Sequence, residues 1–316
     1  MEYEIPDVLS VILRALSFVL LFQAAGIGIF IAIFRRWLAS TQVSIRRLGQ
    51  ASAIGGVVLV GAHFALEAAR MAGDMSGMLD PALQGMAWNS PARTALICRL
   101  AGLLLIAVGL QGASGRSSIV AVVGAVLSTG AFALTGHTSV NAHRGVLAAL
   151  LMLHLLIVAF WFGALWPLYF VSLRETPARA SGIVRRFTGV ATWLVPVILV
   201  AGTAMAILLL PGFSVLTEPY GELLMAKVVG FALLLGLAAA NKWRLGPALR
   251  SGTAGGGQRF RRSVATEYVL IAAVLTITAV MTSFYSPEAC PTVSPASSVI
   301  RFLGAERNIA NAAVPR

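Results

Sequence analysis

The sequence carries four histidines, two cysteines and eight internal methionines, and their side chains are those that bind soft metal ions. Imidazole, thiolate and thioether groups are the ligands that copper prefers, and Cu(I) above all. We predict that all of them lie in the outer half or the outer loops of a membrane protein: His63, His137, His143, His154, Cys98, Cys290, Met71, Met75, Met78, Met86, Met152, Met205, Met225 and Met281. This one-sided distribution favours a protein that handles copper.

The composition predicts a membrane protein. Of the 316 residues, 58% are hydrophobic and 11% are charged, whereas soluble domains average about 25% charged residues. Apolar stretches long enough to cross about 30 Å of hydrocarbon recur along the whole chain. An open sheet cannot satisfy its backbone in lipid, so the spans must be helices and the predicted fold class is all-α. We predict eight spans, at 8–34, 51–72, 92–112, 118–136, 146–170, 188–210, 222–243 and 264–285.

The basic residues predict the orientation of these spans. Lys and Arg outnumber Asp and Glu by 24 to 12, and the excess lies in the odd-numbered loops, whereas the even-numbered loops are poor in cations. The positive-inside rule therefore puts the odd loops in the cytoplasm and both termini outside. The charge is a topology signal whose natural partner is the anionic lipid headgroup rather than nucleic acid.

The two ends and the cysteines add three expectations. Residues 1–7 are acidic, whereas a cleaved signal peptide begins with basic residues, so we expect the first span to be retained. Cys98 lies in a span and Cys290 in the tail, which predicts no disulfide framework. The stretch 251–258 (SGTAGGGQ) has the composition of a flexible linker, and we expect a disordered tail over 287–316.

A weak internal repeat suggests two halves of four spans, at 1–136 and 137–286. Two such halves with the same orientation imply a pseudo-twofold axis along the membrane normal. Biased membrane composition can produce part of the same similarity. The matching segments are RRL at 46–48 with RRF at 185–187, Phe22 to Gly26 with Phe160 to Gly163, and 91–102 with 219–230, which aligns Arg99 with Lys227.

Span 2 carries a stripe of polar and sulfur-bearing side chains. His63, Glu67, Arg70 and Met71 recur at spacings of three and four, which places them on one helical face. Met75 and Met78 join this face if the helix continues into the loop. Such a stripe could carry copper stepwise from the surface to the midplane. The alternative is that the methionines fill gaps in the packing and that Glu67 and Arg70 form a local pair.

Two histidines within spans are predicted to lie at similar depth. His154 of span 5 lies about 12 Å below the outer end at 1.5 Å per residue, and His63 reaches a similar depth in span 2. The two imidazoles could share one metal site, or each could be a buried ring hydrogen-bonded to a neighbouring helix. In the outer loop, His137 and His143 could bind one ion or be merely solvated.

Ionisable groups inside the spans form a separate set. Arg99 and Lys227 lie about two turns from the outer face and could snorkel outward or pair with Glu67, Glu218 or Glu222. Near the inner face, Glu267 lies at the level of Asn241 and Lys242. A polar clamp between spans 7 and 8 is therefore expected, and we interpret it as structural.

A set of segments in the C-terminal half is distinctive as an ordered series: GH at 136–137, LHLLIVAFWFGALWPL at 153–168, RRF at 185–187, EPYGELLMAK at 218–227, AANKWRLGPAL at 239–249 and RRSVATEYVLIAAVLTITAVMTS at 261–283. In this order, over roughly residues 130–285, they resemble the copper resistance protein D (CopD) family of bacterial inner-membrane proteins. The N-terminal half fits the family's eight-span layout with less distinctive sequence.

The resemblance implies a protein of the cytoplasmic membrane that takes part in copper transport or tolerance, often beside a periplasmic copper carrier of the CopC type. Two other functions stay open on the residues alone. His63 and His154 could be the axial ligands of a b-type haem that transfers electrons. A proton-coupled solute carrier could use Glu67, Arg99 and Lys227. We find no nucleophile–base pairing or cofactor motif, so an enzyme is not expected.

Overall fold

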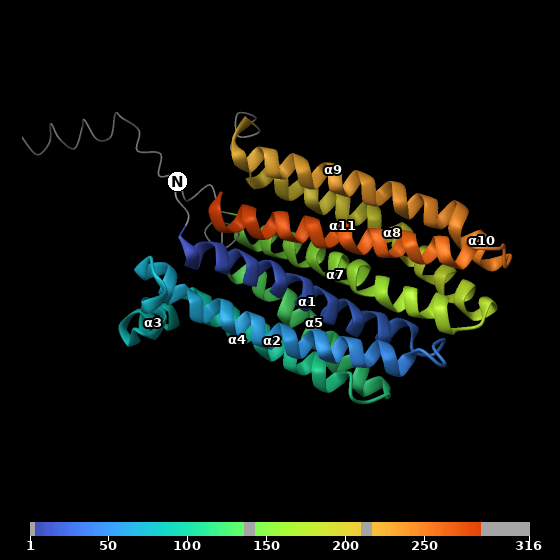
Figure 1. Ribbon diagram of the computed structural model, residues 1–316, viewed down its shortest axis with the longest axis horizontal. Helices are drawn as coiled ribbons and strands as arrows, with labels where there is room; N and C mark the ends of the chain where they lie inside the picture. Colours follow the sequence, from blue (N-terminus) through green and yellow to red (C-terminus); the bar gives the residue numbers. More distant parts are fainter. Residues whose placement is uncertain (1–3, 136–142, 210–216, 286–316) are drawn as a thin grey trace, which may run out of the picture.

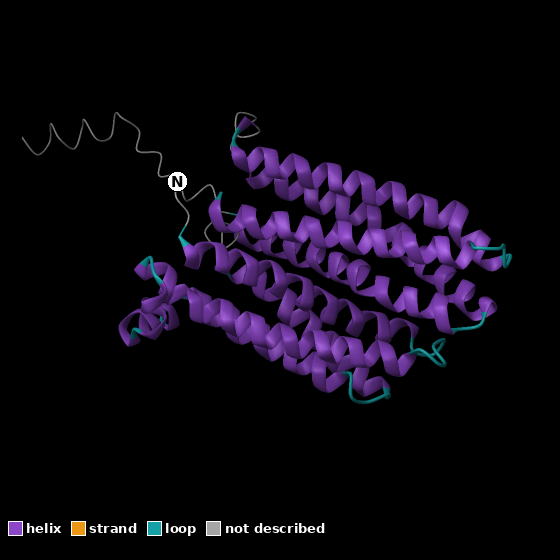
Figure 2. Ribbon diagram, viewed as in Figure 1, coloured by secondary structure: helices purple, strands orange, loops and turns teal. Residues whose placement is uncertain are grey.

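The structure, a computed structural model, describes residues 4–135, 143–209 and 217–285. Within these ranges every regular element is a helix and no strand is present (Figure 2). Eight of the helices are long and apolar enough to cross a membrane. The predicted all-α fold with eight spans is thereby confirmed, and the protein is a multi-pass membrane protein.

The long helices run side by side along the length of the molecule (Figure 1). The start of α1 and the end of α11 lie at one end of the bundle, which the charge distribution predicts to be the outer one. We call this end the outer end and the opposite end the inner end. The elements are α1 (Ile5–Phe34), α2 (Gln42–Ala72), η1 (Met75–Leu79), α3 (Pro81–Trp88), α4 (Pro91–Gly109), α5 (Gly115–Gly130), η2 (Ala131–Leu134), α7 (Arg144–Arg174), α8 (Pro177–Leu209), α9 (Pro219–Ala240), the π-helix η4 (Asn241–Leu245), α10 (Gly246–Arg250) and α11 (Gly256–Phe284).

Three helices begin earlier than their predicted spans. α2 begins at residue 42, α8 at 177 and α11 at 256, because the basic segments before the apolar stretches are themselves helical. Arginine is a good helix former, and outside the hydrocarbon its charge does not oppose the helix. The predicted linker at 251–258 is therefore shorter than expected. Gly252 and Gly255 take positive φ values of 65° and 74° in the turn, and α11 starts at the next residue.

The helices form two groups of four. In the N-terminal group, α1, α2, α4 and α5 pack in a closed ring, each against the next. In the C-terminal group, α8 packs on α7, α7 on α11 and α11 on α9, but α8 and α9 do not pack closely together over the residues that the structure describes. The groups meet where α1 contacts α7, and α11 packs on α1 as α5 packs on α7. Apart from the pair α2 and α4, whose counterparts α8 and α9 do not pack closely, these contacts agree with two parallel repeats. The repeat and its boundary stay predictions.

The contact between α1 and α7 is made backbone to backbone. A Cβ atom added at Gly26 of α1 would overlap the carbonyl oxygen of Ala159, and one added at Gly163 of α7 would lie 2.5 Å from the Cα of Gly26. Small residues at a crossing let two membrane helices approach closely and pack by van der Waals contact. Gln23 strengthens the same crossing, because its amide nitrogen donates to the Gly163 carbonyl at 3.4 Å.

At the inner end, Glu175 joins the two groups of helices. One carboxylate oxygen accepts the backbone N–H groups of Ala39, Ser40 and Thr41 and the Thr41 hydroxyl, at 2.9–3.1 Å. Desolvation raises the pKa of this carboxyl, but the hydrogen bonds from Thr41, Ala39 and Ser40 outweigh it and hold the pKa below its usual value. The carboxylate thus fixes the α1–α2 loop to the end of α7.

Gly26→Ala should destabilise the protein strongly, because the new methyl group meets backbone atoms that have no room to move. We expect a loss at or above the roughly 1–3 kcal/mol that overpacking costs, measured as thermal unfolding of the detergent-purified protein. Gly61→Ala is the matched control, since a Cβ atom there meets nothing within 4 Å. Equal stability of the two variants would contradict a backbone crossing at Gly26.

Glu175→Gln should be less stable than the wild type near neutral pH, by about 1–3 kcal/mol, because hydrogen bonds to a charged acceptor are lost. A depressed pKa contributes stability above the ordinary value of 4.5, and this stability is lost as the pH falls through the lower folded-state value. We would measure the free energy of unfolding of the wild type and of Glu175→Gln near neutral pH and again in acid below the ordinary pKa of 4.5. The difference in stability between the two proteins should be smaller in acid. Glu222→Gln, at an exposed position, is the control, and a difference independent of pH would exclude this role of Glu175.

Candidate functional site

The outer end of α2 is covered by a small helical cap, which we define as residues 71–88. α2 ends at Ala72 because Gly73 takes a left-handed conformation, φ 83°, the usual stop signal of a helix. Asp74 then accepts a hydrogen bond from the Ser76 N–H, and Asp80 caps α3 in the same way. The condition under which Met75 and Met78 would join the helical stripe is therefore not met, because the chain turns back and η1 packs on α2.

The outer cap presents sulfur atoms to its surroundings. Met71, Met75 and Met86 are 49%, 41% and 59% exposed, whereas Met78 is half-buried and its carbonyl accepts from Gln84. Hydrogen bonds from Ser76 hold the pKa of the exposed Asp74 carboxyl below its usual value, so an ionised carboxylate stands beside Met75 in the sequence. Exposed thioethers with a fixed negative charge nearby can attract and hold a soft cation.

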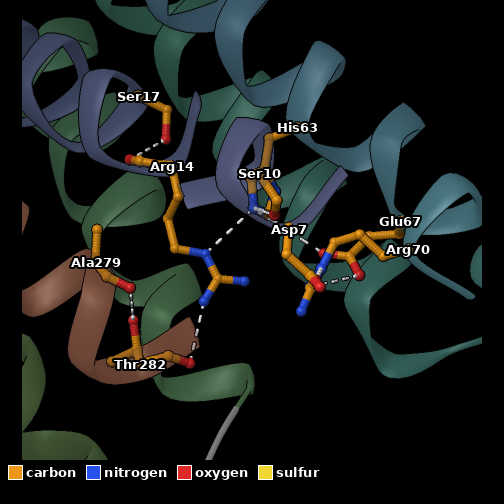
Figure 3. Close-up of polar contacts among 9 residues, drawn as sticks. All are labelled: Asp7, Ser10, Arg14, Ser17, His63, Glu67, Arg70, Ala279 and Thr282. Carbon is orange, nitrogen blue, oxygen red and sulfur yellow. Dashed lines mark hydrogen bonds and ion pairs between the residues drawn. The ribbon is translucent and has the colours of Figure 1, made fainter. Parts of the chain in front are cut away.

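Below the cap, His63 belongs to a polar network between α1 and α2 (Figure 3). Arg14 donates from Nε to His63 Nε2 at 3.2 Å, and the Ser10 hydroxyl lies 3.3 Å from the same nitrogen. An arginine can only donate, so Nε2 is the acceptor and the ring is neutral. Arg14 also donates to the Thr282 carbonyl of α11 at 3.2 Å. The Nε2 lone pair is thus engaged, and a cation lies directly against it.

The other charged residues of the stripe form ion pairs with one another. Arg70 donates to Asp7 at 3.1 Å and to Glu67 at 3.3 Å (Figure 3). The local pair of Glu67 and Arg70 is therefore present. Through Asp7, Arg70 also fixes the start of α1 to the end of α2, so this part of the predicted stripe connects two helices.

His154 lies in a different environment. A Cβ atom added at Gly202 of α8 would come within 3.5 Å of the imidazole, and Nδ1 is buried with no hydrogen-bond partner over the described residues. Lys227 of α9 acts on this ring electrostatically. His63 faces α1 whereas His154 faces α8, and α1 runs between α2 and α7 (Figure 1). The structure does not bring the two imidazoles together, so the expected shared site has no support, for copper or for haem iron.

The reason is that depth along a helix says nothing of the direction in which a side chain points. His63 and His154 lie nine and ten residues from the outer ends of α2 and α7, as the sequence indicated, but on faces that meet different neighbours. Two axial ligands must face one iron, and these two rings do not face each other.

Arg99 and Lys227 make no ion pair with any acidic residue that the structure describes. The Arg99 guanidinium lies 4.3 Å from the centre of the Phe132 ring, and its Nε is buried without a hydrogen-bond partner in the described part of the chain. The suggested pairs with Glu67, Glu218 and Glu222 are thus not formed, and a cation–π contact takes their place for Arg99.

The expected contact between Asn241 and Glu267 is present. The Asn241 amide donates to one oxygen of the carboxylate, and Trp161 Nε1 donates to the other at 3.2 Å. Lys242 donates instead to the Thr192 hydroxyl of α8. Trp161 was not predicted as a partner, because it is 106 residues away in the sequence and on a helix that no local pattern connects with α11.

The outer-loop histidines are only partly described. His143 stands at the N-cap position of α7, at the outer end, whereas His137 and Cys290 lie outside the described residues. Within the described ranges no group of three or more His, Cys, Asp or Glu side chains could hold a metal ion. In the described part of the chain, the methionines of the outer cap are therefore the soft ligands that lie closest together in the sequence.

The fold and these residues define a polytopic helical membrane protein with soft ligands at one end. Two family models match its sequence: residues 5–149 match the copper resistance protein D-like N-terminal domain, and residues 181–281 match copper resistance protein D. The chain therefore belongs to the copper resistance protein D family, as the resemblance predicted. No curated protein and no solved structure was found to be similar.

Arg14→Leu should expose His63 to chemical modification, because it removes the donor that occupies Nε2. We expect diethyl pyrocarbonate to modify His63 several times faster in this variant than in the wild type, as measured by mass spectrometry of peptides. Ser10→Ala removes the other contact and leaves Arg14 in place, so it should change the rate little. An unchanged rate in Arg14→Leu would show that Arg14 does not protect the ring.

Proposed function

We propose that the protein carries copper from the periplasm across the bacterial inner membrane and receives it at the outer cap. The main support is the group of exposed methionines at 71, 75 and 86. In addition, the His, Cys and Met residues of the described spans all lie in their outer halves. Family membership supports the metal, because the family is one of copper resistance. In this proposal both termini face the periplasm, as the positive-inside rule predicts.

The direction follows from where the ligands are. A cation entering from outside would first meet thioethers and the ionised Asp74, whereas the inner ends of the described helices carry arginines and lysines instead. An exporter would need ligands that collect the metal at the cytoplasmic mouth. The distribution therefore supports uptake, in which exposed thioethers exchange Cu(I) with a periplasmic carrier of the CopC type, the partner that the family leads us to expect.

Within the membrane, His154 is a better candidate ligand than His63. His154 has a hydrogen bond with the backbone of Ile198 in α8. If the protonated Nε2 makes this bond, the buried Nδ1, which has no other partner among the described residues, keeps an open lone pair. His63 would have to displace Arg14 before it could bind a metal. We therefore assign the capture of copper to Met71, Met75, Met78 and Met86 and its passage to His154, with His143 at the same outer end.

The test is copper uptake into proteoliposomes that contain the purified protein. Replacing Met71, Met75 and Met86 with leucine keeps side-chain volume and removes three exposed thioethers. We expect KM for Cu(I) to rise by about tenfold or more, since each tenfold in affinity is only about 1.4 kcal/mol. The maximal rate should change less, because the capture site precedes the path through the membrane.

Met281→Leu is the matched control, because Met281 is a buried packing residue of α11 and this variant should keep the wild-type KM.

His154→Ala should lower the maximal rate, whereas His63→Ala should mainly reduce stability. An unchanged KM in the triple leucine variant would overturn the capture site. Copper bound without uptake would indicate sequestration, and a Soret band in the purified protein would point to haem.

A further inference from the structure

Glu267 is a carboxylate in the interior of the C-terminal group of helices. It lies in α11, 3% exposed, and is the only acidic residue among the buried side chains of the described part of the protein. Its two oxygens accept from Trp161 of α7 and from Asn241 at the end of α9. Three helices therefore converge on one ionisable group, and both of its hydrogen-bond donors are neutral.

Among the residues that the structure describes, no cation pairs with this carboxylate. Within that part of the chain it makes no ion pair, and no charged group acts on it electrostatically. The ionisable groups on the surrounding elements are directed elsewhere: Lys242 of η4 donates to Thr192, Arg261 of α11 to Ser172 of α7, and Arg14 of α1 to His63 and Thr282, while Tyr268 of α11 stacks on Phe162. On the neighbouring elements, no hydrogen bond or ion pair joins the carboxylate to Tyr169, Arg174, Lys227, Arg244 or Arg250.

An isolated charge within a membrane protein is costly, and such residues commonly mark a path for ions or protons. Binding a proton removes the negative charge of Glu267 and with it the cost of burying that charge. The two neutral donors act in the opposite sense, because they stabilise the ionised form. This balance suits a group that gains and loses a proton in the working cycle, whereas a purely structural carboxylate is normally paired with a cation.

Asn241 is built to serve both forms of the carboxyl group. Its amide nitrogen donates to Glu267, while its Oδ1 is buried and has no partner among the described residues. When Glu267 is ionised it accepts from the amide, and when it carries a proton its O–H can donate to Oδ1 after the amide turns over. The pair thus stays hydrogen-bonded with or without the proton.

Asn241 also connects this pair to the inner surface. It is the first residue of the π-helix η4, and the three residues after it are exposed. Single turns of π-helix inside α-helices occur frequently at functional sites. Glu267 therefore lies one turn of η4 away from the side of the membrane that the basic residues predict to be cytoplasmic.

We propose that Glu267 binds a proton exchanged with the cytoplasmic side, and that this proton is coupled to the movement of copper. In each cycle one proton bonds to a carboxyl oxygen, one negative charge disappears from the membrane interior, and the Asn241 amide changes from donor to acceptor. The coupling rests on the proposed function, whereas the proton site does not.

The proton site is tested without copper, by infrared difference spectroscopy of the purified protein as the pH is lowered. We expect a band of a protonated, buried carboxyl group in the wild type and its loss in Glu267→Gln, which keeps the size of the side chain. Trp161→Phe should keep the band but shift its frequency, because one hydrogen bond is removed. Glu222→Gln, at an exposed position, should leave the band unchanged.

A band that persists in Glu267→Gln, or the absence of any such band in the wild type, would overturn the proton site. The coupling is tested with proteoliposomes under an imposed pH gradient: copper flux in the wild type should respond to the gradient, and that response should be lost in Glu267→Gln. If copper flux in the wild type does not depend on the pH gradient, the coupling is overturned, but the proton site is not. If the wild type moves no copper, the proposed function fails, and the infrared result still decides on the site.

Discussion

The contact of Gly26 with Gly163 is the constraint on which the arrangement of the protein depends. Because neither residue has a side chain, α1 and α7 touch through their backbones, and large residues around the contact, among them Phe22, Ile27 and Phe162, are fully buried. Gly26 is the fifth residue of the segment that begins at Phe22, and Gly163 is the fourth residue of the segment that begins at Phe160, so each glycine ends one of the two similar segments. If the two halves are a parallel repeat, this contact is where its pseudo-twofold axis would pass between α1 and α7.

The two groups of helices around this axis differ in a way that bears on function. The N-terminal group is closed, and Arg14, His63 and Arg70 tie its helices together inside. In the N-terminal group α2 packs on α4. Their counterparts in the C-terminal group, α8 and α9, do not pack closely over their described lengths. Of the described span Pro219–Arg250, only α10, which continues the span of α9, packs closely on α8. Local opening costs least where few buried contacts are lost, so we expect the C-terminal group to open more easily than the N-terminal group. His154 and Glu267, the two buried groups best suited to bind an ion, both lie there.

The sequence predicted the class of the fold because hydropathy acts on whole segments, so that eight apolar stretches need eight helices. The orientation that the basic loops indicate stays a prediction. The sequence did not predict contacts that depend on the direction of a side chain or on a partner far away in the chain. Gly73 ends α2 before Met75, which a spacing of four cannot reveal. Arg14 is 49 residues from the ring it contacts, and Trp161 is 106 residues from Glu267. Such contacts depend on how each helix is rotated about its own axis relative to its neighbours. Local periodicity in the sequence does not specify which neighbouring helix a given face will meet.

The buried charges suggest how the proposed capture of copper would be coupled to the proposed proton site. On the proposed uptake path a copper ion below the outer cap would meet Arg14, Arg99 and Lys227, and neither Arg99 nor Lys227 is neutralised by an acidic partner in the described part of the chain. Like charges repel strongly where water is excluded, so inward movement needs a compensating negative charge. Glu67 and Asp7 are already paired with Arg70, and Glu267 is the only acidic side chain that is buried in the described part of the protein. Ionised, it would draw the cation inward; protonated from the cytoplasm, it would no longer hold it, and the metal could leave on that side.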